Sequence, residues 1–181
     1  MTVGARRLAM SLLSLVACLW SLSCGYTTRP GLASHLKTVY VKPFTNRIDV
    51  TQASVSTERF PIYHHRMEVN LTNAVLDRLQ FTGILRPASR EKADTRLEGE
   101  LVGFRRDALR YDQNSQVEEW RLSLIVNLKF VDQTTNTLIW DEENLTGDTT
   151  YLVASESESS ALNRAFIDLA RRIVERIVEN W

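Results

Sequence analysis

Four stretches of the chain alternate apolar and polar residues, which is the period-two pattern of a strand with one buried face. These stretches are residues 38–44, 95–111, 120–131 and 137–141. Pro43 places the first stretch at a strand end or on the edge of a sheet. Gly103 interrupts the phase of the second stretch and indicates a bulge or a bend. The fourth stretch has room to extend towards Tyr151.

Two other stretches repeat apolar residues every three or four positions, which predicts amphipathic helices. The first helix opens at Pro61, and its apolar face consists of Met67, Leu71, Ala74, Val75 and Leu79. Gly83 suits the left-handed position that follows a last helical turn. The second helix follows a capping box formed by Ser155 and Glu158. Its apolar stripe consists of Leu162, Ala165, Phe166, Leu169, Ile173 and Ile177.

The predicted order of elements is strand, helix, three strands and helix (β-α-β-β-β-α). The polar residues 45–60 are predicted as a loop, and residues 82–94 as a polar connection. Two helices packed on one face of a four-stranded, mostly antiparallel sheet are the simplest arrangement, which makes the fold class α+β. Residues 38–181 are expected to form a single α+β domain of this kind.

The N-terminus has the pattern of an export signal. Arg6 and Arg7 form a short basic region, and residues 8–22 contain no charge. This apolar run is shorter than a membrane-spanning helix, which needs about 20 residues, and it suits the apolar core of a signal peptide. We therefore expect a lipoprotein signal peptide at residues 1–23.

Cys24 is the expected lipidation site. Residues 21–24 resemble a bacterial lipobox, although Ser21 stands where the pattern usually has leucine. Cys18 is a rival site whose preceding residues fit the pattern better but whose apolar core would be short. A third alternative is an ordinary signal peptide with neither cysteine modified. Acyl chains on Cys24 would give a stable membrane anchor, and residues 24–37 would form the lipidated tether.

Composition narrows the functional classes. The chain carries 22 basic and 22 acidic residues, so its formal net charge is zero, and a nucleic-acid-binding role is disfavoured. Both cysteines precede residue 25, so the expected domain has no internal disulfide and no thiol nucleophile. The adjacent His64 and His65 would point about 100° apart on a helix and would not converge on a metal. We expect no catalytic residue, no metal site and no cofactor, and so no enzyme.

Basic residues give the one positive indication of binding chemistry. Arg105, Arg106 and Arg110 cluster near the end of the second predicted strand. Arginine favours bidentate contact with phosphate or carboxylate, so the cluster is a candidate anion site. The alternative is that Arg105 or Arg106 pairs with Glu118 or Glu119 on the next strand. Further basic residues on the preceding loop are Arg86, Arg90 and Lys92.

Several short motifs, taken in their order along residues 24–181, resemble the lipopolysaccharide-assembly lipoprotein family (LptE). The motifs are Cys24-Gly25-Tyr26, the strand of residues 39–44 with Thr45-Asn46 after it, Leu71-Thr72-Asn73-Ala74, Asp77-Arg78-Leu79, Ala93-Asp94-x-x-Leu97-x-Gly99, Leu138-Ile139-Trp140, and residues 169–174 in the last helix. The loop of residues 45–60 is longer than the family leads us to expect.

The resemblance implies a non-catalytic lipoprotein anchored at the periplasmic face of the outer membrane. Family members sit in the lumen of a large outer-membrane β-barrel (LptD) as its plug and assembly partner, and the pair delivers lipopolysaccharide to the outer leaflet. The resemblance also implies lipopolysaccharide binding by basic residues, for which Arg105, Arg106 and Arg110 are candidates from charge alone. Two alternatives remain: a generic periplasmic lipoprotein that scaffolds another envelope complex, and an enzyme with a shallow site.

Overall fold

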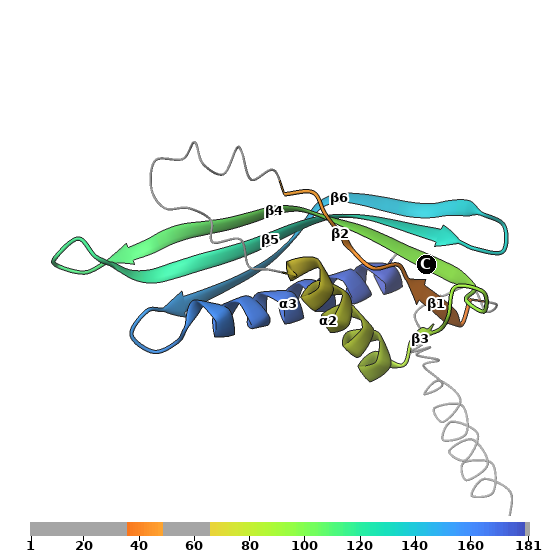
Figure 1. The fold of residues 1–181 in the computed structure, drawn as a ribbon, viewed down its shortest axis with the longest axis horizontal. Coiled ribbons are helices and arrows are strands. Elements are labelled where there is room, and N and C mark those ends of the chain that lie inside the picture. The colour runs from red at the N-terminus through yellow and green to blue at the C-terminus, as the bar shows by residue number, and fades with distance from the viewer. Residues whose placement is uncertain (1–35, 49–65, 180–181) are drawn as a thin grey trace, which may run out of the picture. The chain divides into compact units, whose positions relative to one another are not determined.

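The computed structural model describes residues 36–48 and 66–179, which form six strands and two helices (Figure 1). These residues belong to one compact unit that spans residues 31–181. The predictions for the signal peptide (residues 1–23), for Cys18 and Cys24, and for His64 and His65 concern residues outside the described ranges.

Three long antiparallel strands form the body of the sheet. They are β4 (Thr95–Tyr111), β5 (Val117–Asp132) and β6 (Thr137–Leu152). The predicted strand of residues 95–111 is confirmed at both ends, and the fourth predicted strand does extend past Tyr151. The pairing of β4 with β5 shifts register between Leu101 and Gly103, which confirms the bulge predicted at Gly103.

Three short strands make the sheet mixed, and the prediction of four mostly antiparallel strands is wrong in this respect. β1 (Thr38–Val41) pairs in parallel with β4 and with β3 (Arg86–Pro87), and β2 (Thr45–Asn46) pairs in parallel with β4. The strand order is β3-β1-β4-β5-β6, with β2 beside β4. β2 and β3 have two residues each, too few to show alternation, so the sequence predicts only a loop and a polar connection at these positions.

The first helix, α2 (Met67–Thr82), ends as the sequence predicts. Gly83 adopts a left-handed conformation with φ 64°, and its N–H donates to the carbonyl of Leu79 at 3.0 Å. The predicted start at Pro61 lies outside the described residues, which begin here with Arg66. Met67, Leu71, Val75 and Leu79 are buried, and Ala74 is half-buried, which confirms the predicted apolar face.

The second helix, α3 (Glu158–Glu179), begins later than predicted. The predicted capping box is wrong, because the N–H groups of Ser155 and Glu156 still bond the carbonyl of Leu152 in the turn after β6. Ser157 takes the capping position instead, and its Oγ accepts the N–H of Ser160 at 3.3 Å. All six residues of the predicted apolar stripe are buried.

Both helices cover the same face of the sheet, which confirms an α+β fold with two helices on one side (Figure 1). The core between the layers contains Leu124, Leu128 and Phe130 of β5 and Leu169 and Ile173 of α3, all at most 1% exposed. Gly147 lets α3 approach β6 closely. A Cβ on this glycine would lie 2.5 Å from the Cβ of Leu169 and 2.8 Å from its Cα.

Candidate functional site

One end of the sheet consists of the β4–β5 hairpin and the end of β6, which pairs with β5 as far as Glu119. Past Leu101, whose carbonyl accepts the N–H of Arg47 at 2.8 Å, the described part of β4 pairs only with β5. The hairpin turn is ordered by Asp112, whose Oδ1 accepts the N–H groups of Asn114 and Gln116, each at 2.8 Å. The hairpin is therefore a defined structure that extends beyond β1 and β2.

Exposed apolar side chains gather at this end, which we call the distal tip. Leu109 and Tyr111 of β4 are 41% and 57% exposed, and Leu152 and Val153 at the end of β6 are 38% and 53% exposed. The N–H of Val153 donates to the carbonyl of Glu118 at 3.0 Å, which fixes the end of β6 to the hairpin. Together with Arg110 and its partners Glu118 and Glu119, these residues form a surface that is both apolar and charged.

The three candidate arginines do not form one cluster. Arg105 and Arg110 pair across the hairpin with Ser123 and Glu119, whereas Arg106 pairs with Leu122. Since successive residues of a strand point to opposite faces, Arg106 lies on the face that carries the core, and Arg105 lies on the open face. The sequence places these residues close together but does not show on which face each one lies.

Arg106 is held inside the fold by two elements. Its guanidinium lies 4.0 Å from the centre of the Trp120 ring, and its Nη1 lies 2.8 Å from Oε2 of Glu158. The Tyr151 hydroxyl donates to the same carboxylate at 3.3 Å. Burial, reinforced by the charge of Glu158, raises the pKa of this hydroxyl. Arg106 therefore connects the hairpin to the first turn of α3.

The other two arginines are more accessible. Arg110 is an exposed residue whose Nη2 lies 3.1 Å from Glu119 and whose Nε lies 3.4 Å from Glu118. The expected pairing with Glu118 or Glu119 is thus made by Arg110, and not by Arg105 or Arg106. Arg105 is exposed, and its side chain has no ion pair or hydrogen bond within the described residues.

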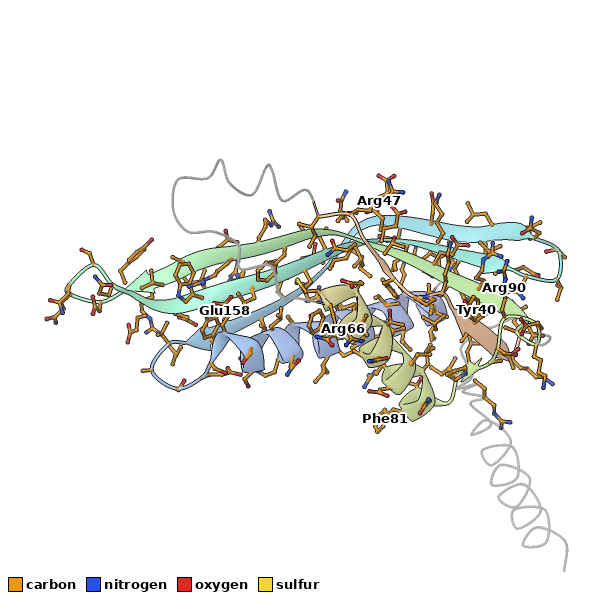
Figure 2. The ribbon with its side chains drawn as sticks, viewed as in Figure 1. Tyr40, Arg47, Arg66, Phe81, Arg90 and Glu158 are labelled. Carbon is orange, nitrogen blue, oxygen red and sulfur yellow. The ribbon has the colours of Figure 1, made fainter. Side chains whose placement is uncertain are left out.

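Arg86 of β3 and the turn residues Arg90 and Lys92 lie at the other end of the sheet. They precede or flank the first residues of β4, whereas Arg110 lies near its last residue. A strand as long as β4 spans about 50 Å. Figure 2 shows the same separation, with Arg90 and Glu158 at opposite ends of the fold. The basic residues noted in the sequence therefore belong to two distinct surfaces.

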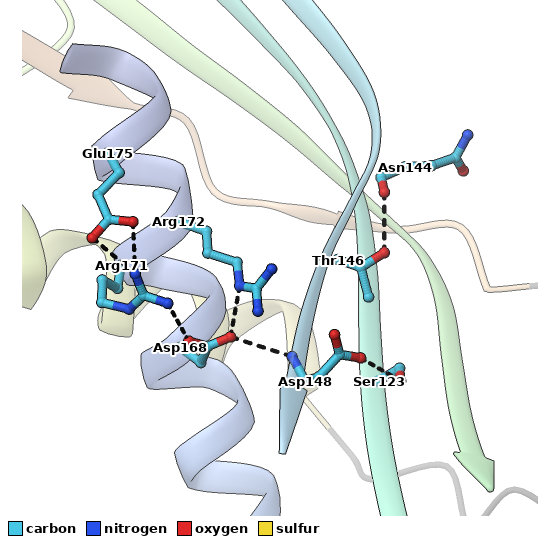
Figure 3. A network of polar contacts seen from close by, with 8 residues as sticks. All are labelled: Ser123, Asn144, Thr146, Asp148, Asp168, Arg171, Arg172 and Glu175. Atoms are coloured by element: carbon cyan, nitrogen blue, oxygen red, sulfur yellow. Dashed lines mark hydrogen bonds and ion pairs between the residues drawn. The ribbon is translucent and has the colours of Figure 1, made fainter. Parts of the chain in front are cut away.

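α3 is joined to β6 by a network of polar contacts around Asp168 (Figure 3). Its carboxylate accepts from Arg171 at 2.7 Å, from Arg172 at 2.8 Å and from the N–H of Asp148 at 3.3 Å. Burial acts to raise the pKa of Asp168, but these hydrogen bonds outweigh it and lower the pKa below its ordinary value. Nearby, Arg164 Nη2 donates to the carbonyl of Thr150 at 2.7 Å.

The open face of the sheet has a shallow depression of about 430 Å³ lined mainly by charged residues. Opposite charges are paired there, with Lys42 3.3 Å from Glu98 and Arg47 3.3 Å from Glu100. Within the described ranges, no three His, Cys, Asp or Glu side chains are placed to hold a metal ion. No helix in this part of the chain is long and apolar enough to cross a membrane.

The apolar residues of the distal tip were not identified from the sequence. Leu109 and Tyr111 directly precede the predicted turn at Asp112, and Leu152 and Val153 directly precede the turn before the last helix. Their position was the available sequence signal for exposure, because apolar residues beside a predicted turn can lie beyond the part of the sheet that the two helices cover. Alternation alone counts them as core positions.

Comparison with known proteins identifies relatives of the whole fold. The model of the LptE family, described as lipopolysaccharide-assembly, matches residues 36–177. None of the curated proteins compared matches the chain. Among solved structures, protein XCC0632 from Xanthomonas campestris is similar with a TM-score of 0.53 and 14% identity, over 84% of this chain and 86% of that one.

Two further solved structures are similar. The hypothetical protein CT253 from Chlamydia trachomatis has a TM-score of 0.51 and 14% identity, over 78% of this chain and 95% of that one. A minor lipoprotein from Acinetobacter baumannii has a TM-score of 0.49 and 18% identity, over 80% of this chain and 94% of that one. At these identities, the likeness to XCC0632 and CT253 shows a shared fold alone.

Proposed function

Because the chain belongs to the lipopolysaccharide-assembly family LptE, we propose that it is an outer-membrane lipoprotein that partners and plugs the barrel that exports lipopolysaccharide. In this proposal residues 1–23 are a cleaved signal peptide, Cys24 carries the acyl chains, residues 24–37 are the tether, and residues 38–181 are the working domain. The protein acts by binding and assembly, without a catalytic step.

The distal tip is the observation that carries the proposed contact with lipopolysaccharide. This ligand has phosphate groups beside acyl chains. The tip sets Arg110 among four exposed apolar side chains, and Arg105 is exposed further along the same strand. Guanidinium groups bind phosphate through charge-assisted hydrogen bonds, and apolar side chains gain free energy by leaving water. Arginines at this site would replace divalent cations between phosphates and loosen lipopolysaccharide aggregates.

The open face suits the lumen of an outer-membrane barrel. Such lumens are polar, so a plug needs a surface that remains favourable against charged and hydrogen-bonding groups. The open face presents alternating charges, including Lys42 with Glu98 and Arg47 with Glu100. The apolar face of the sheet is covered by α2 and α3 within the same chain.

Affinity purification of the tagged chain from detergent-solubilised outer membranes tests the proposal. A large β-barrel protein in roughly stoichiometric amount, identified by mass spectrometry, is the expected result. The Cys24→Ser variant should leave the membrane fraction, and Cys18→Ser is the matched control that should remain there. Recovery of the chain with periplasmic partners only would contradict the barrel partnership and favour a generic envelope scaffold.

A further inference from the structure

The end of the sheet where the chain enters the fold carries four exposed basic residues, and we call it the proximal end. Lys37 precedes β1, Arg86 lies in β3, and Arg90 and Lys92 lie in the turn before β4. Glu91 is the one acidic residue in the described segments 36–38 and 85–93. The excess of positive charge here contrasts with the zero net charge of the whole chain.

The neighbouring carboxylates are turned into the fold. Asp94 accepts the N–H groups of Lys37 and Thr38, each at 2.9 Å, and the Thr38 hydroxyl at 2.8 Å. Asp132 is 8% exposed and accepts from Thr134. These carboxylates therefore organise the backbone of the proximal end.

The backbone under the four cations is held in place. The N–H of Arg86 donates to the carbonyl of Lys37 at 3.0 Å, and the N–H of Lys92 donates to the carbonyl of Ser89 at 3.0 Å. The Gln133 side-chain amide also donates to the carbonyl of Arg90. A surface whose backbone is already ordered binds without the cost of ordering a loop.

The four cationic side chains have no partner inside the fold. Within the described residues, none of them takes part in an ion pair or side-chain hydrogen bond. Nine other basic residues of the described ranges form ion pairs, and they are Lys42, Arg47, Arg96, Arg106, Arg110, Arg164, Arg171, Arg172 and Arg176. The proximal end therefore gathers four basic side chains whose charge no ion pair within the described residues neutralises.

We propose that the proximal end docks on a membrane surface that carries anionic phospholipid headgroups. This inference rests on the proposed lipidation of Cys24, because that anchor is joined to the fold at this end. The eleven residues 25–35 cannot extend beyond about 40 Å, so the anchor holds the proximal end near the lipid surface. The distal tip lies about 50 Å further along the sheet.

Acyl chains and a basic patch reinforce each other at a membrane. One lipid signal alone binds reversibly, and a basic patch is a second signal that makes attachment stable. A basic residue close to an anionic bilayer strengthens binding by roughly fivefold, and salt screens the effect. Docking through the proximal end would orient the long axis of the sheet, with the distal tip directed away from the headgroups.

Vesicle binding tests the proposal without the lipid anchor. The mature chain from residue 24, with Cys24→Ser, is sedimented with vesicles of phosphatidylcholine alone or mixed with phosphatidylglycerol. Binding is expected for the mixed vesicles only, and it should fall as salt is added. The K37Q/R86Q/R90Q/K92Q variant should lose at least tenfold in affinity, and K37Q/R90Q/K92Q, which leaves β3 unchanged, should lose nearly as much.

The matched control removes the same charge elsewhere. The R47Q/R66Q/R121Q/K129Q variant, whose four residues are exposed and lie outside both the proximal end and the distal tip, should bind the mixed vesicles like the parent chain. Equal loss in both quadruple variants would mean that net charge alone acts, and it would overturn the proposal, as would equal binding to both vesicle types. These vesicles contain neither lipopolysaccharide nor a barrel protein, so a negative result here leaves the barrel partnership to its own experiment.

Discussion

Arg106 of β4 forms an ion pair with Glu158, the first residue of α3, across 2.8 Å. The two residues are far apart in the sequence, and their contact fixes the hairpin against the start of the last helix. The pair is partly shielded from water, since the side chains of Arg106 and Glu158 are 25% and 18% exposed. Arg106, a candidate ligand-binding residue from the sequence, therefore stabilises the fold through its contact with Glu158.

Replacement of Arg106 by glutamine should lower the free energy of unfolding by about 1–2 kcal/mol, through loss of the ion pair and of the contact with the Trp120 ring. Urea-induced unfolding followed by circular dichroism measures this change. Arg105→Gln, one position away on the open face, is the control and should change stability by less than about 0.5 kcal/mol. Equal stability of both variants would contradict the assigned role of Arg106.

Lipopolysaccharide binding should depend on Arg105 and Arg110. The double variant R105Q/R110Q is expected to bind labelled lipopolysaccharide roughly fivefold to thirtyfold more weakly, if each exposed contact contributes about 0.5–1 kcal/mol. Arg106→Gln should keep its binding, provided that the assay is run where it remains folded. Loss of binding in Arg106→Gln, with R105Q/R110Q unchanged, would place the site on the other face of the hairpin.

The apolar part of the distal tip should contribute separately. L152S/V153S removes two exposed apolar side chains without removing charge, so it should weaken lipopolysaccharide binding and leave the salt dependence of binding unchanged. R105Q/R110Q should reduce that salt dependence. Binding titrations at several salt concentrations distinguish the two effects. An L152S/V153S variant that binds like the parent chain would limit the contact to the phosphates.

Gly147→Ala should destabilise the fold strongly. The new Cβ would meet the backbone of α3 at Leu169, which cannot move like the end of a flexible side chain. We expect a loss of about 1–3 kcal/mol or more in the free energy of unfolding. Gly103→Ala is the matched control, because the three atoms nearest to its Cβ would belong to the Ile125 side chain, at 3.0 Å or more. Urea unfolding measures the loss of unfolding free energy in each variant. A larger loss for Gly147→Ala than for Gly103→Ala is expected if α3 packs closely on β6.

Stability should depend on the ionisation of Asp168. The folded state lowers the pKa of this carboxyl below its ordinary value of 3.8, so the unfolded state binds the proton more tightly. The contribution of Asp168 is therefore complete well above 3.8 and is lost as the pH falls through the lower, folded pKa. Asp168→Asn should be destabilised near neutral pH, and the difference from the parent chain should shrink in acid.

Urea unfolding across the acid range measures this dependence. Glu175→Gln, which removes an exposed partner of Arg171 on the same helix, is the control and should show a smaller difference at neutral pH. A difference between Asp168→Asn and the parent chain that is constant with pH would show that the carboxylate charge does not contribute.

The long elements of this fold could be predicted from the sequence because each has a strong local pattern. β5 alternates through Leu122, Leu124, Val126 and Leu128, and every one of these residues is buried. The short strands could not be predicted, because β2 and β3 exist through their pairing with β4 and β1 and have no pattern of their own. The start of α3 was misplaced because both Ser155 and Ser157 suit a capping position, and the turn after β6 decides between them.

The candidate site was predicted only in part. Sequence reasoning identified Arg105, Arg106 and Arg110 by charge, and the structure divides them by the face of the strand and by their partners. A bulge between Ala108 and Arg110 shifts the alternation of side chains along β4, and this shift determines on which face Arg110 lies. The bulge has no recognisable pattern in the sequence. Exposed apolar residues were missed because their exposure depends on how far α2 and α3 extend along the sheet.

The contacts between α3 and β6 also affect how separate copies of the chain meet. β6 is the last strand of the sheet, and backbone groups on such a strand can recruit a strand from another molecule. Here the N–H of Asp148 and the carbonyl of Thr150 are already bonded to Asp168 and Arg164 of the same chain. These two groups are therefore not free to pair with a strand of another copy, which lowers the tendency of this half of β6 to associate edge to edge.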